Sequence, residues 1–240
     1  MNEQVRSDRE PLVREPLCVV ALVSGGIESA VLVKELLAAG HTVIPCYVEA
    51  GLRWEASERR ALEGLLEVLA HERLEDLVVL SMPVADCYRD HWSLTGAAVP
   101  DAASPDGAVE LPGRNLLLLA KAAVYAADRG AEAVALGSLK GNPFPDATAA
   151  FFAAMEEAVS QAMGRPMAVM TPLAHLDKAE VLRRAGPIPL DRTFSCIAPL
   201  DGLHCGRCNK CAERRRGFAQ AGLADPTPYA VSPPVKEPTA

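Results

Sequence analysis

No apolar run in the sequence approaches the length of a membrane span, and no charged start is followed by the apolar segment of a secretory signal. We therefore expect a cytoplasmic protein that does not contact membranes. An excess of positive charge is also lacking, because 31 acidic side chains outnumber 24 basic ones. Nucleic-acid phosphates are bound by clustered Lys and Arg, so this balance argues against nucleic acid as the main partner. The two basic clusters, Arg183–Arg184 and Arg214–Arg216, are typical of solvated helix faces or helix carboxyl ends.

Internal repeats are absent too, and the sequence alternates between predicted strands and predicted helices. With 240 residues, of which 50% are hydrophobic, the chain can build one substantial core. We expect buried strands at residues 19–23, 41–48, 77–80, 133–138 and 167–173. We expect helices at residues 27–39, 54–70, 111–130, 147–163 and 177–186. This alternation predicts an α/β fold with a doubly wound, mainly parallel sheet that is covered by helices on both faces.

The first strand runs directly into a turn made of Ser24, Gly25 and Gly26, and a helix follows from Ile27. A helix start leaves backbone N–H groups unpaired, and the helix dipole adds positive potential there. The glycines let the backbone approach an anion, and Ser24 and Ser29 add hydroxyl donors. We interpret residues 24–29, called the glycine turn below, as a phosphate-binding element at the ligand-binding edge of the sheet. The alternative is an ordinary strand-to-helix turn that contains two glycines.

The glycine turn lacks the lysine of the common nucleoside-triphosphate loop. That loop has the pattern GxxxxGK[ST], and its lysine reaches the terminal phosphates. Here the first lysine after the glycines is Lys34, which lies well along the predicted helix. The turn is therefore not of this common type.

Seven cysteines are present, and four of them lie in the last quarter of the chain. In an intracellular protein such clustering indicates a metal site rather than disulfides. Cys205, Cys208 and Cys211 form consecutive CxxC pairs, and Cys196 lies one loop upstream. This spacing predicts a closed, tetrahedral, structural zinc site, because short turns let the sulfurs point at one ion while backbone N–H groups stabilise them. An iron–sulfur cluster is the competing interpretation, although the run lacks the Cys-Pro that continues a bacterial ferredoxin motif.

Several charged residues near predicted element ends are further site candidates. Arg114 opens a helix, where its charge opposes the dipole unless an anion lies beside it; a surface ion pair is the alternative. Lys178 likewise lies near the start of a predicted helix, where it would be expected to face an anion; a lysine that points into solvent is the simpler interpretation. Asp146 is predicted either to cap the following helix or to contact the substrate. Residues 82–112 break the pattern and are expected to form a long loop or lid over the substrate.

Taken together, the motifs resemble the 7-cyano-7-deazaguanine synthases, a family of PP-loop ATP pyrophosphatases. The resemblance runs from about Val19 to Phe218 and begins with the glycine turn, which is similar to the family's SGGxDS signature except that Glu28 replaces the Asp. The other matching motifs are Pro112–Asn115, Phe144–Asp146, Thr171–Leu173 with Lys178, and the Cys196–Cys211 cluster. Two more departures are the segment Glu49–Trp54, where the family has a Tyr-Gly-Gln pattern, and Ala147, where it usually has Cys.

The resemblance implies an adenine nucleotide alpha hydrolase-like PP-loop fold and a homodimeric carbon–nitrogen ligase. ATP would adenylate 7-carboxy-7-deazaguanine, ammonia would displace AMP to give an amide, and a second adenylation would lead to the nitrile, a queuosine precursor. Mg2+ would neutralise the departing pyrophosphate, while Zn2+ would be structural. The catalytic residues implied are Ser24, Glu28, Ser29, Arg114 and Lys178. The nucleotide contacts implied are Leu22, Val23, Ser24, Gly25, Gly26, Ile27, Glu28, Ser29 and Gly137.

Two other functions stay open at this point. One is a divergent relative that adenylates a related acid and joins it to another amine, a protein or a nucleic acid. The other is a zinc-stabilised nucleotide-binding module without turnover, for which Glu28 would be the lesion. A tRNA thiolation enzyme would need a basic surface and a reactive Cys outside the metal site, and neither is evident. We expect a flexible arm (1–16), a nucleotide-binding domain (17–190), a zinc-binding segment (191–222) and a disordered tail (223–240).

Overall fold

The computed structural model of the protein describes residues 15–231. Nearly all of the predicted N-terminal arm therefore lies outside the described residues, as do residues 232–240 of the predicted tail. The sheet has five parallel strands in the order β3-β2-β1-β4-β5. The doubly wound parallel sheet expected from the sequence is thereby confirmed. The strands are β1 (Cys18–Leu22), β2 (Thr42–Glu49), β3 (Val78–Ser81), β4 (Ala133–Ala135) and β5 (Ala168–Met170).

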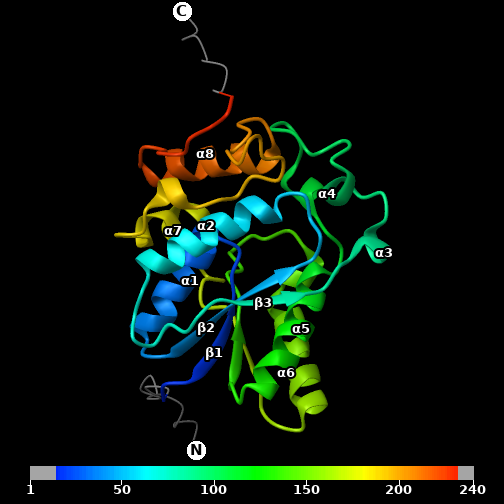
Figure 1. Ribbon diagram of the computed structural model, residues 1–240, viewed down its shortest axis with the longest axis vertical. Coiled ribbons are helices and arrows are strands. Elements are labelled where there is room, and N and C mark those ends of the chain that lie inside the picture. The colour runs from blue at the N-terminus through cyan, green and yellow to red at the C-terminus, as the bar shows by residue number, and fades with distance from the viewer. Residues whose placement is uncertain (1–14, 232–240) are drawn as a thin grey trace, which may run out of the picture.

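Helices cover both faces of this sheet (Figure 1). Alternate residues of β1 face two apolar layers, with Val19 and Ala21 in one and Val20 and Leu22 in the other. Because β1 is buried on both faces, its sequence is a continuous apolar run rather than an alternating one. The first layer includes α1 (Ile27–Ala38), α2 (Glu55–Val68) and α7 (Lys178–Arg184), and the second includes α5 (Arg114–Asp128) and α6 (Ala149–Met163).

A third apolar cluster lies beyond the carboxyl ends of the strands. It joins the four clustered cysteines to Trp54 and Leu111. A hydrogen bond from Asn209 N to Pro100 O (2.9 Å) connects residues 191–222, called the cysteine region below, to the segment that follows β3. The elements of this part, at the top and right of Figure 1, are α3 (Ala85–Tyr88), α4 (Trp92–Thr95) and α8 (Asn209–Ala221).

Residues 82–112 are more ordered than the long loop predicted for them. Besides α3 and α4 they contain a 3-10 helix, η1 (Asp106–Val109). The short helix α4 is capped by His91, whose Nδ1 lies 2.9 Å from the Ser93 hydroxyl. Such helices of a single turn carry little apolar periodicity, so the sequence pattern does not reveal them.

The prediction that Asp146 caps the next helix is wrong. That helix, α6, begins at Ala149, and its N-cap is Thr148, whose Oγ1 accepts a hydrogen bond from Phe151 N (3.1 Å). The Asp146 carboxylate instead accepts from the backbone N–H of Asn115 (2.8 Å), in the first turn of α5. Asp146 therefore provides an acceptor for an N–H group at the amino end of α5, a helix that precedes it in the chain.

Two predictions about the C-terminal region need correction. Arg214 does not lie on a solvated face, because it is fully buried and its Nε donates to Thr227 Oγ1 (2.6 Å). The predicted tail is packed against the domain as far as Tyr229, since Thr227 is buried and the Tyr229 hydroxyl donates to Asp225 Oδ2 (2.7 Å). A buried guanidinium needs acceptors; Thr227 of the tail supplies one, and Ser195 Oγ and the Leu190 carbonyl supply the others.

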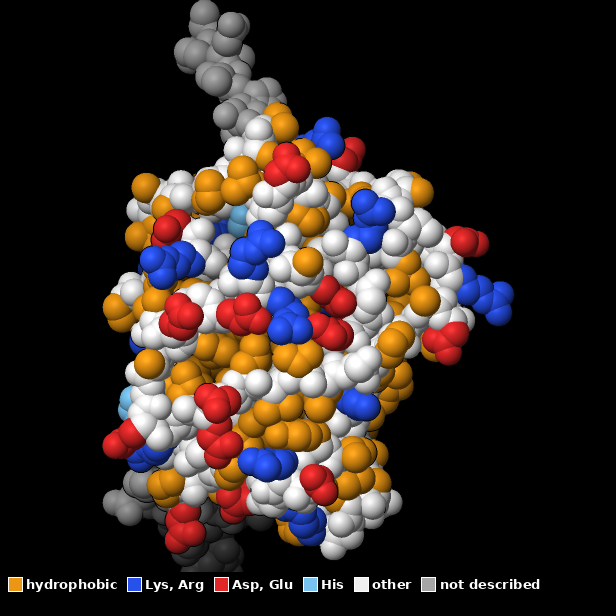
Figure 2. Space-filling view, in the orientation of Figure 1, with side chains coloured by type: hydrophobic (Ala, Val, Ile, Leu, Met, Phe, Trp, Pro, Cys, Tyr) orange, Lys and Arg blue, Asp and Glu red, His pale blue; other side chains and the backbone are white. Residues whose placement is uncertain are grey.

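The outer surface carries charges of both signs. Figure 2 shows basic side chains distributed singly among acidic ones on the face of the molecule that carries α2, with apolar side chains gathered below them. That face presents no basic patch of the kind that tracks a nucleic-acid backbone. Among residues 15–231, no helix combines the length and the apolar character needed to span a membrane.

Candidate active site and metal centre

Most of the predicted site residues meet at one cavity. It has a volume of about 550 Å³ and opens where the strand order reverses between β1 and β4. Ile27 does not line it, because that side chain is fully buried in the core. A more open depression of about 630 Å³ runs along α2 and contains none of the predicted residues. Those that do line the cavity are Leu22, Val23, Ser24, Gly26, Glu28, Ser29, Arg114, Gly137 and Lys178.

The glycine turn presents hydrogen-bond donors to this cavity. Ser24 N donates to Ser29 Oγ (2.9 Å), and the two serine hydroxyls lie 3.1 Å apart. Helix α1 begins after Gly26, and no side chain among residues 15–231 caps its first turn. The N–H groups of that turn are therefore left for a ligand, and the helix dipole favours an anion.

Gly25 fixes the turn against its surroundings. Its φ is 74°, and a Cβ built there would lie 2.7 Å from the carbonyl oxygen of Glu58 and 2.9 Å from Leu62 N. On its other side, Phe194 N donates to the Gly25 carbonyl (2.8 Å). Only glycine combines this backbone conformation with such a close approach. Gly25 thus packs between α2 and the cysteine region instead of lining the cavity.

The two glycines should respond differently to substitution. Gly25→Ala is expected to lower the free energy of unfolding by about 2–4 kcal/mol, because left-handed strain adds to a clash with the backbone of α2. Gly26→Ala should fold, since the nearest atoms to its Cβ lie 3.5 Å away. It should nevertheless weaken pyrophosphate binding, because the methyl group fills the turn. Urea denaturation and calorimetric titration measure both effects; equal destabilisation by the two variants would contradict this account.

Four alternating charges line another part of the cavity. Lys178 Nζ contacts Glu28 Oε1 and lies 3.6 Å from Glu213 Oε1, while Lys210 contacts the other oxygen of Glu213. The side chain of Lys178 is only 12% exposed. The account of Lys178 as a solvent-facing lysine is therefore wrong, because it faces two carboxylates.

The charges in this network support one another. Burial, the largest single effect, raises the pKa of Glu28, but the charge and hydrogen bond of Lys178 together with the charge of Lys210 hold the pKa below the ordinary value. For Glu213, burial is likewise outweighed by Lys210 and Lys178, and its pKa falls to about 2. Burial lowers the pKa of Lys178, yet the two carboxylates raise it above the ordinary value. Glu28 therefore keeps, at neutral pH, the negative charge that an Asp would carry.

The end of β4 forms a further wall of the site. A Cβ built at Gly137 would lie 3.1 Å from the Cβ of Glu28, so a side chain there would displace the first turn of α1. The next residue, Ser138, lines the cavity, and within residues 15–231 its buried Oγ has no hydrogen-bond partner. A buried hydroxyl without a partner is rare in folded proteins, which indicates that a ligand satisfies it. Ser138 was not among the predicted site residues, although it lies at the predicted strand end.

Arg114 lies at the start of α5 with its side chain at the cavity. Among residues 15–231, no carboxylate lies within 4.0 Å of its guanidinium. The alternative of an Arg held in a surface ion pair is therefore wrong. A cation that is free at the amino end of a helix strengthens the attraction for an anionic ligand.

Sequence reasoning missed a buried acid in the cavity wall. Glu58 is 8% exposed and lines the cavity, and its Oε2 accepts a hydrogen bond from the Tyr47 hydroxyl (3.0 Å). Burial raises the pKa of Glu58 to about 7, although Arg114 and the Tyr47 hydrogen bond act against it. Glu58 lies four residues before Leu62 and seven before Leu65, on the apolar face of α2. That spacing was the one signal in the sequence that could have found it.

Glu58→Gln is expected to make stability less dependent on pH. The folded carboxyl keeps its proton up to about pH 7, whereas the ordinary value is 4.5. Between these pH values the native state binds more protons, so the free energy of unfolding of the wild type falls as pH rises. The variant lacks this group, so its free energy of unfolding relative to that of the wild type should rise by on the order of 1–3 kcal/mol between pH 5 and pH 8. Urea denaturation at the two pH values measures the difference, and a constant gap would refute a protonated Glu58.

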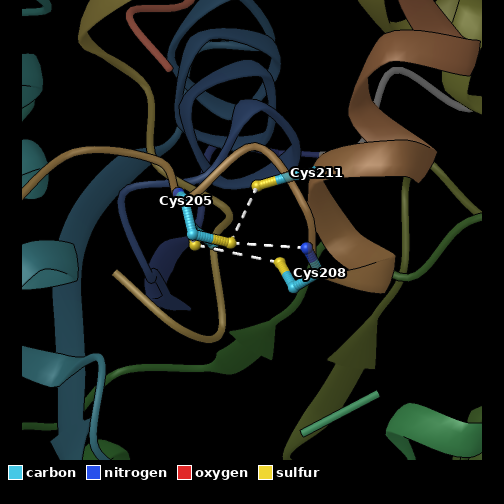
Figure 3. A group of neighbouring side chains, drawn as sticks. Cys205, Cys208 and Cys211 are labelled. Carbon is cyan, nitrogen blue, oxygen red and sulfur yellow. Dashed lines mark hydrogen bonds between the residues drawn. The ribbon is translucent and has the colours of Figure 1, made fainter. Parts of the chain in front are cut away.

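The sulfurs of Cys205, Cys208 and Cys211 point toward one another (Figure 3), and Cys196 lies between Ser195 and Ile197, which line the cavity. The Sγ atoms of Cys196, Cys205, Cys208 and Cys211 are buried and lie within 4.8 Å of one another. Cys196 and Cys208 are 3.8 Å apart, and Cys205 and Cys211 are 3.9 Å apart. A tetrahedron with metal–sulfur bonds of about 2.3 Å has sulfur–sulfur edges of roughly 3.8 Å. The donor set therefore fits one tetrahedral metal ion.

Backbone N–H groups surround these sulfurs, as the CxxC spacing predicts. Ala198 N and Cys205 N donate to Cys196 Sγ (3.4 and 3.3 Å), and Arg207 N and Cys208 N donate to Cys205 Sγ (3.4 and 3.3 Å). Such bonds favour the thiolate form that binds metal. In a four-iron cluster each cysteine binds its own iron on the outside of the cluster, which separates the sulfurs more widely. The observed spacing fits a single ion better.

Known proteins share this sequence and architecture. Residues 18–222 match the family described as queuosine biosynthesis protein QueC. The chain belongs to the QueC family. It is 33% identical over 226 residues to the 7-cyano-7-deazaguanine synthase of Methanothrix thermoacetophila, a match that covers 88% of this chain and 97% of the relative. It is 32% identical to 7-cyano-7-deazaguanine synthase 1 of Sphingopyxis alaskensis, and that match covers 88% of this chain and 98% of the relative.

A solved structure of a tRNA thiolase also shares the fold. The U34-tRNA thiolase of Methanococcus maripaludis, solved with its [4Fe-4S] cluster, matches with a TM-score of 0.53 at 11% identity. The match covers 87% of this chain and 68% of the thiolase. The expected PP-loop fold is thereby confirmed, and the likeness extends to the fold alone.

Proposed function

We propose that this QueC-family protein is a 7-cyano-7-deazaguanine synthase. It converts 7-carboxy-7-deazaguanine and ammonia to the nitrile for queuosine biosynthesis, and it cleaves ATP to AMP and pyrophosphate. The observation that carries the proposal is the single cavity to which the glycine turn, Arg114 and Lys178 all contribute. The printed names of the relatives at 33% and 32% identity support the substrate class.

The reaction needs activation because a carboxylate is a poor electrophile. A carboxylate oxygen attacks the α-phosphorus of ATP, and pyrophosphate leaves. Ammonia then adds to the acyl carbon, a proton is lost and AMP leaves, which gives the amide. The amide oxygen attacks a second ATP in the same way, pyrophosphate leaves, and loss of AMP and of both protons from nitrogen leaves the nitrile. One nitrile therefore uses one ammonia and two ATP.

The cavity residues take roles that match the charge developed in these steps. Ser24, Ser29 and the free N–H groups of α1 hold the pyrophosphate. Arg114 and Lys178 share the negative charge that the leaving group gains. The Ser138 hydroxyl, which lacks a partner within the described residues, donates to the bound nucleotide. Positive groups fixed in place before the reaction stabilise its transition state more than mobile ones do.

Two metals complete the proposal. Glu28 is ionised and lines the cavity, and since Lys178 contacts one of its carboxylate oxygens, the other can bind Mg2+. When bound, Mg2+ neutralises charge on the pyrophosphate. Cys196, Cys205, Cys208 and Cys211 hold Zn2+ in a closed shell, so that ion stabilises the fold and leaves no position for substrate.

We also propose a homodimer, as the family resemblance implies, and a cytoplasmic location, where thiolates stay reduced. Light scattering coupled to size exclusion should give twice the mass of the 25.5 kDa chain. A mass equal to one chain across the accessible concentration range would exclude the dimer.

Product analysis on the purified protein tests the activity. AMP release is measured with and without 7-carboxy-7-deazaguanine and ammonia, and the product is identified by mass spectrometry. The expected result is the nitrile, with two AMP for each. Acid-dependent AMP release that ends in a different conjugate would indicate a divergent relative. No AMP under any condition, together with ATP binding, would indicate a nucleotide-binding module.

A further inference from the structure

The cavity extends beyond the elements that the nucleotide needs. Four neighbouring residues that line it, called the wall below, form two pairs: Tyr47 is hydrogen-bonded to Glu58, and the ring of Trp54 stacks on that of Trp92. The two rings are stacked, with centroids 5.6 Å apart and planes inclined by 21°. Trp54 is 3% exposed and precedes α2, whereas Trp92 begins α4 and arrives from the segment that follows β3. A flat aromatic surface is thus placed next to a buried carboxyl group.

This wall is held from several sides. Tyr47, at 3% exposure, comes from β2 and donates its hydroxyl to one oxygen of the Glu58 carboxyl. The backbone of Glu58 is fixed as well, because its carbonyl meets Gly25 of the glycine turn. Arg114 lies near enough for its charge to act on both Glu58 and Tyr47. The carboxyl group is therefore oriented before any ligand arrives, which is what selective recognition requires.

The chemistry of the wall selects among flat heterocycles. A guanine-type ring carries the N1–H and the 2-amino group side by side, and these two donors match the two oxygens of the Glu58 carboxyl in its ionised form, which it reaches by losing its proton near pH 7. An adenine edge instead pairs one donor with one acceptor, so a carboxylate matches it only in part. Aromatic side chains stack on either ring, which makes the carboxyl group the discriminating element.

We propose that the Glu58 carboxylate accepts hydrogen bonds from the N1–H and 2-amino groups of a 7-deazaguanine ring, and that the Trp54–Trp92 pair packs against that ring. This inference rests on the proposed function and adds the site that selects the base. Glu58 binds the part of the substrate that does not react, while the glycine turn binds the phosphates. The Tyr47 hydroxyl positions Glu58 through the bond it donates.

Calorimetric titration with two ligands tests the proposal in the wild-type protein. The ligands are 7-carboxy-7-deazaguanine and its analogue without the 2-amino group. We expect the analogue to bind about 10- to 100-fold more weakly, because one buried oxygen of Glu58 loses its partner. Equal affinity for the two ligands would overturn the proposal, and this comparison requires no variant to fold.

Glu58→Gln supplies the second arm. The variant should bind the acid about 10- to 100-fold more weakly, should no longer distinguish it from the analogue, and should bind ATP within twofold of the wild type. Glu63→Gln is the matched control, since Glu63 lies on the same helix and its side chain is 54% exposed. It should behave as the wild type does. Weaker binding of ATP with unchanged binding of the acid would assign Glu58 to adenine and overturn the proposal.

The two failures are distinguishable. If the wild-type protein forms the nitrile but binds the analogue equally well, the proposed function stands and this inference is wrong. If the wild-type protein binds neither the acid nor the analogue, both the proposed function and this inference are wrong.

Discussion

Lys178→Met is expected to reduce AMP formation about 100- to 1000-fold, because the variant removes a fixed positive charge from the pyrophosphate site. It also leaves Glu28 without its closest cation in a partly buried position, since the side chain of Glu28 is 22% exposed. Removing one partner of a fully buried ion pair typically costs about 3–5 kcal/mol of stability. The partial exposure of Glu28 and the nearby charge of Lys210 reduce this to about 1–3 kcal/mol. The prediction is checked by AMP release at saturating ATP together with urea denaturation of the same preparation.

Two further variants separate charge from folding in this result. Lys34→Met is the control for a lysine on α1 that lies outside the cavity and is 33% exposed, and its activity should stay within about twofold of the wild type. Glu28→Gln combined with Lys178→Met removes the unpaired charge and should regain most of the lost stability. Activity should not return with it. Recovery of activity in the double variant would show that Lys178 serves only to neutralise Glu28.

Cys208→Ser is expected to remove the metal and to lower the melting temperature by about 10–20 °C, which corresponds to roughly 5 kcal/mol for a chain of this size. Structural zinc contributes that much because the site does not exist in the unfolded chain. Cys208 precedes α8, so its loss also frees the start of that helix. Metal content by mass spectrometry should fall from one zinc per chain to near zero, and differential scanning calorimetry measures the shift.

Cys87→Ser is the control for this variant, because Cys87 is exposed and lies outside the cluster. It should keep its zinc and its melting temperature. Detection of iron with labile sulfide in the wild-type protein would show that the cysteines hold an iron–sulfur cluster instead of zinc. Retention of zinc by Cys208→Ser would show that three sulfurs suffice and that the shell is not closed as proposed.

The turn at residues 24–29 and the grouping of the four cysteines could be predicted because each depends on residues that are close in the sequence. Ser24, Gly26 and Ser29 lie within one strand-to-helix junction, and CxxC spacing by itself brings sulfurs together. The continuous apolar run of β1 likewise indicates a strand buried on both faces. In each case the residues that interact are neighbours in the sequence.

The parts that could not be predicted depend on packing between distant segments. Lys178 meets Glu28 across 150 positions of the chain, and its second partner, Glu213, comes from another helix. Asp146 was correctly recognised as a residue able to cap a helix, yet it caps α5, which precedes it. Glu58 looks like one more charged residue of α2 until the fold buries it against the cavity. Local pattern gives the type of each residue but not its partner.

The hydrogen bond from Phe194 N to the carbonyl of Gly25 has a consequence for protein engineering. It makes the cysteine region a support for the glycine turn, which rests on α2 at its other side. A chimaera that imports residues 191–222 from a relative would bring a support shaped for a different turn. Transfer of α2 and the glycine turn together with that region would keep all three surfaces matched, so it is the exchange most suited to preserve turnover.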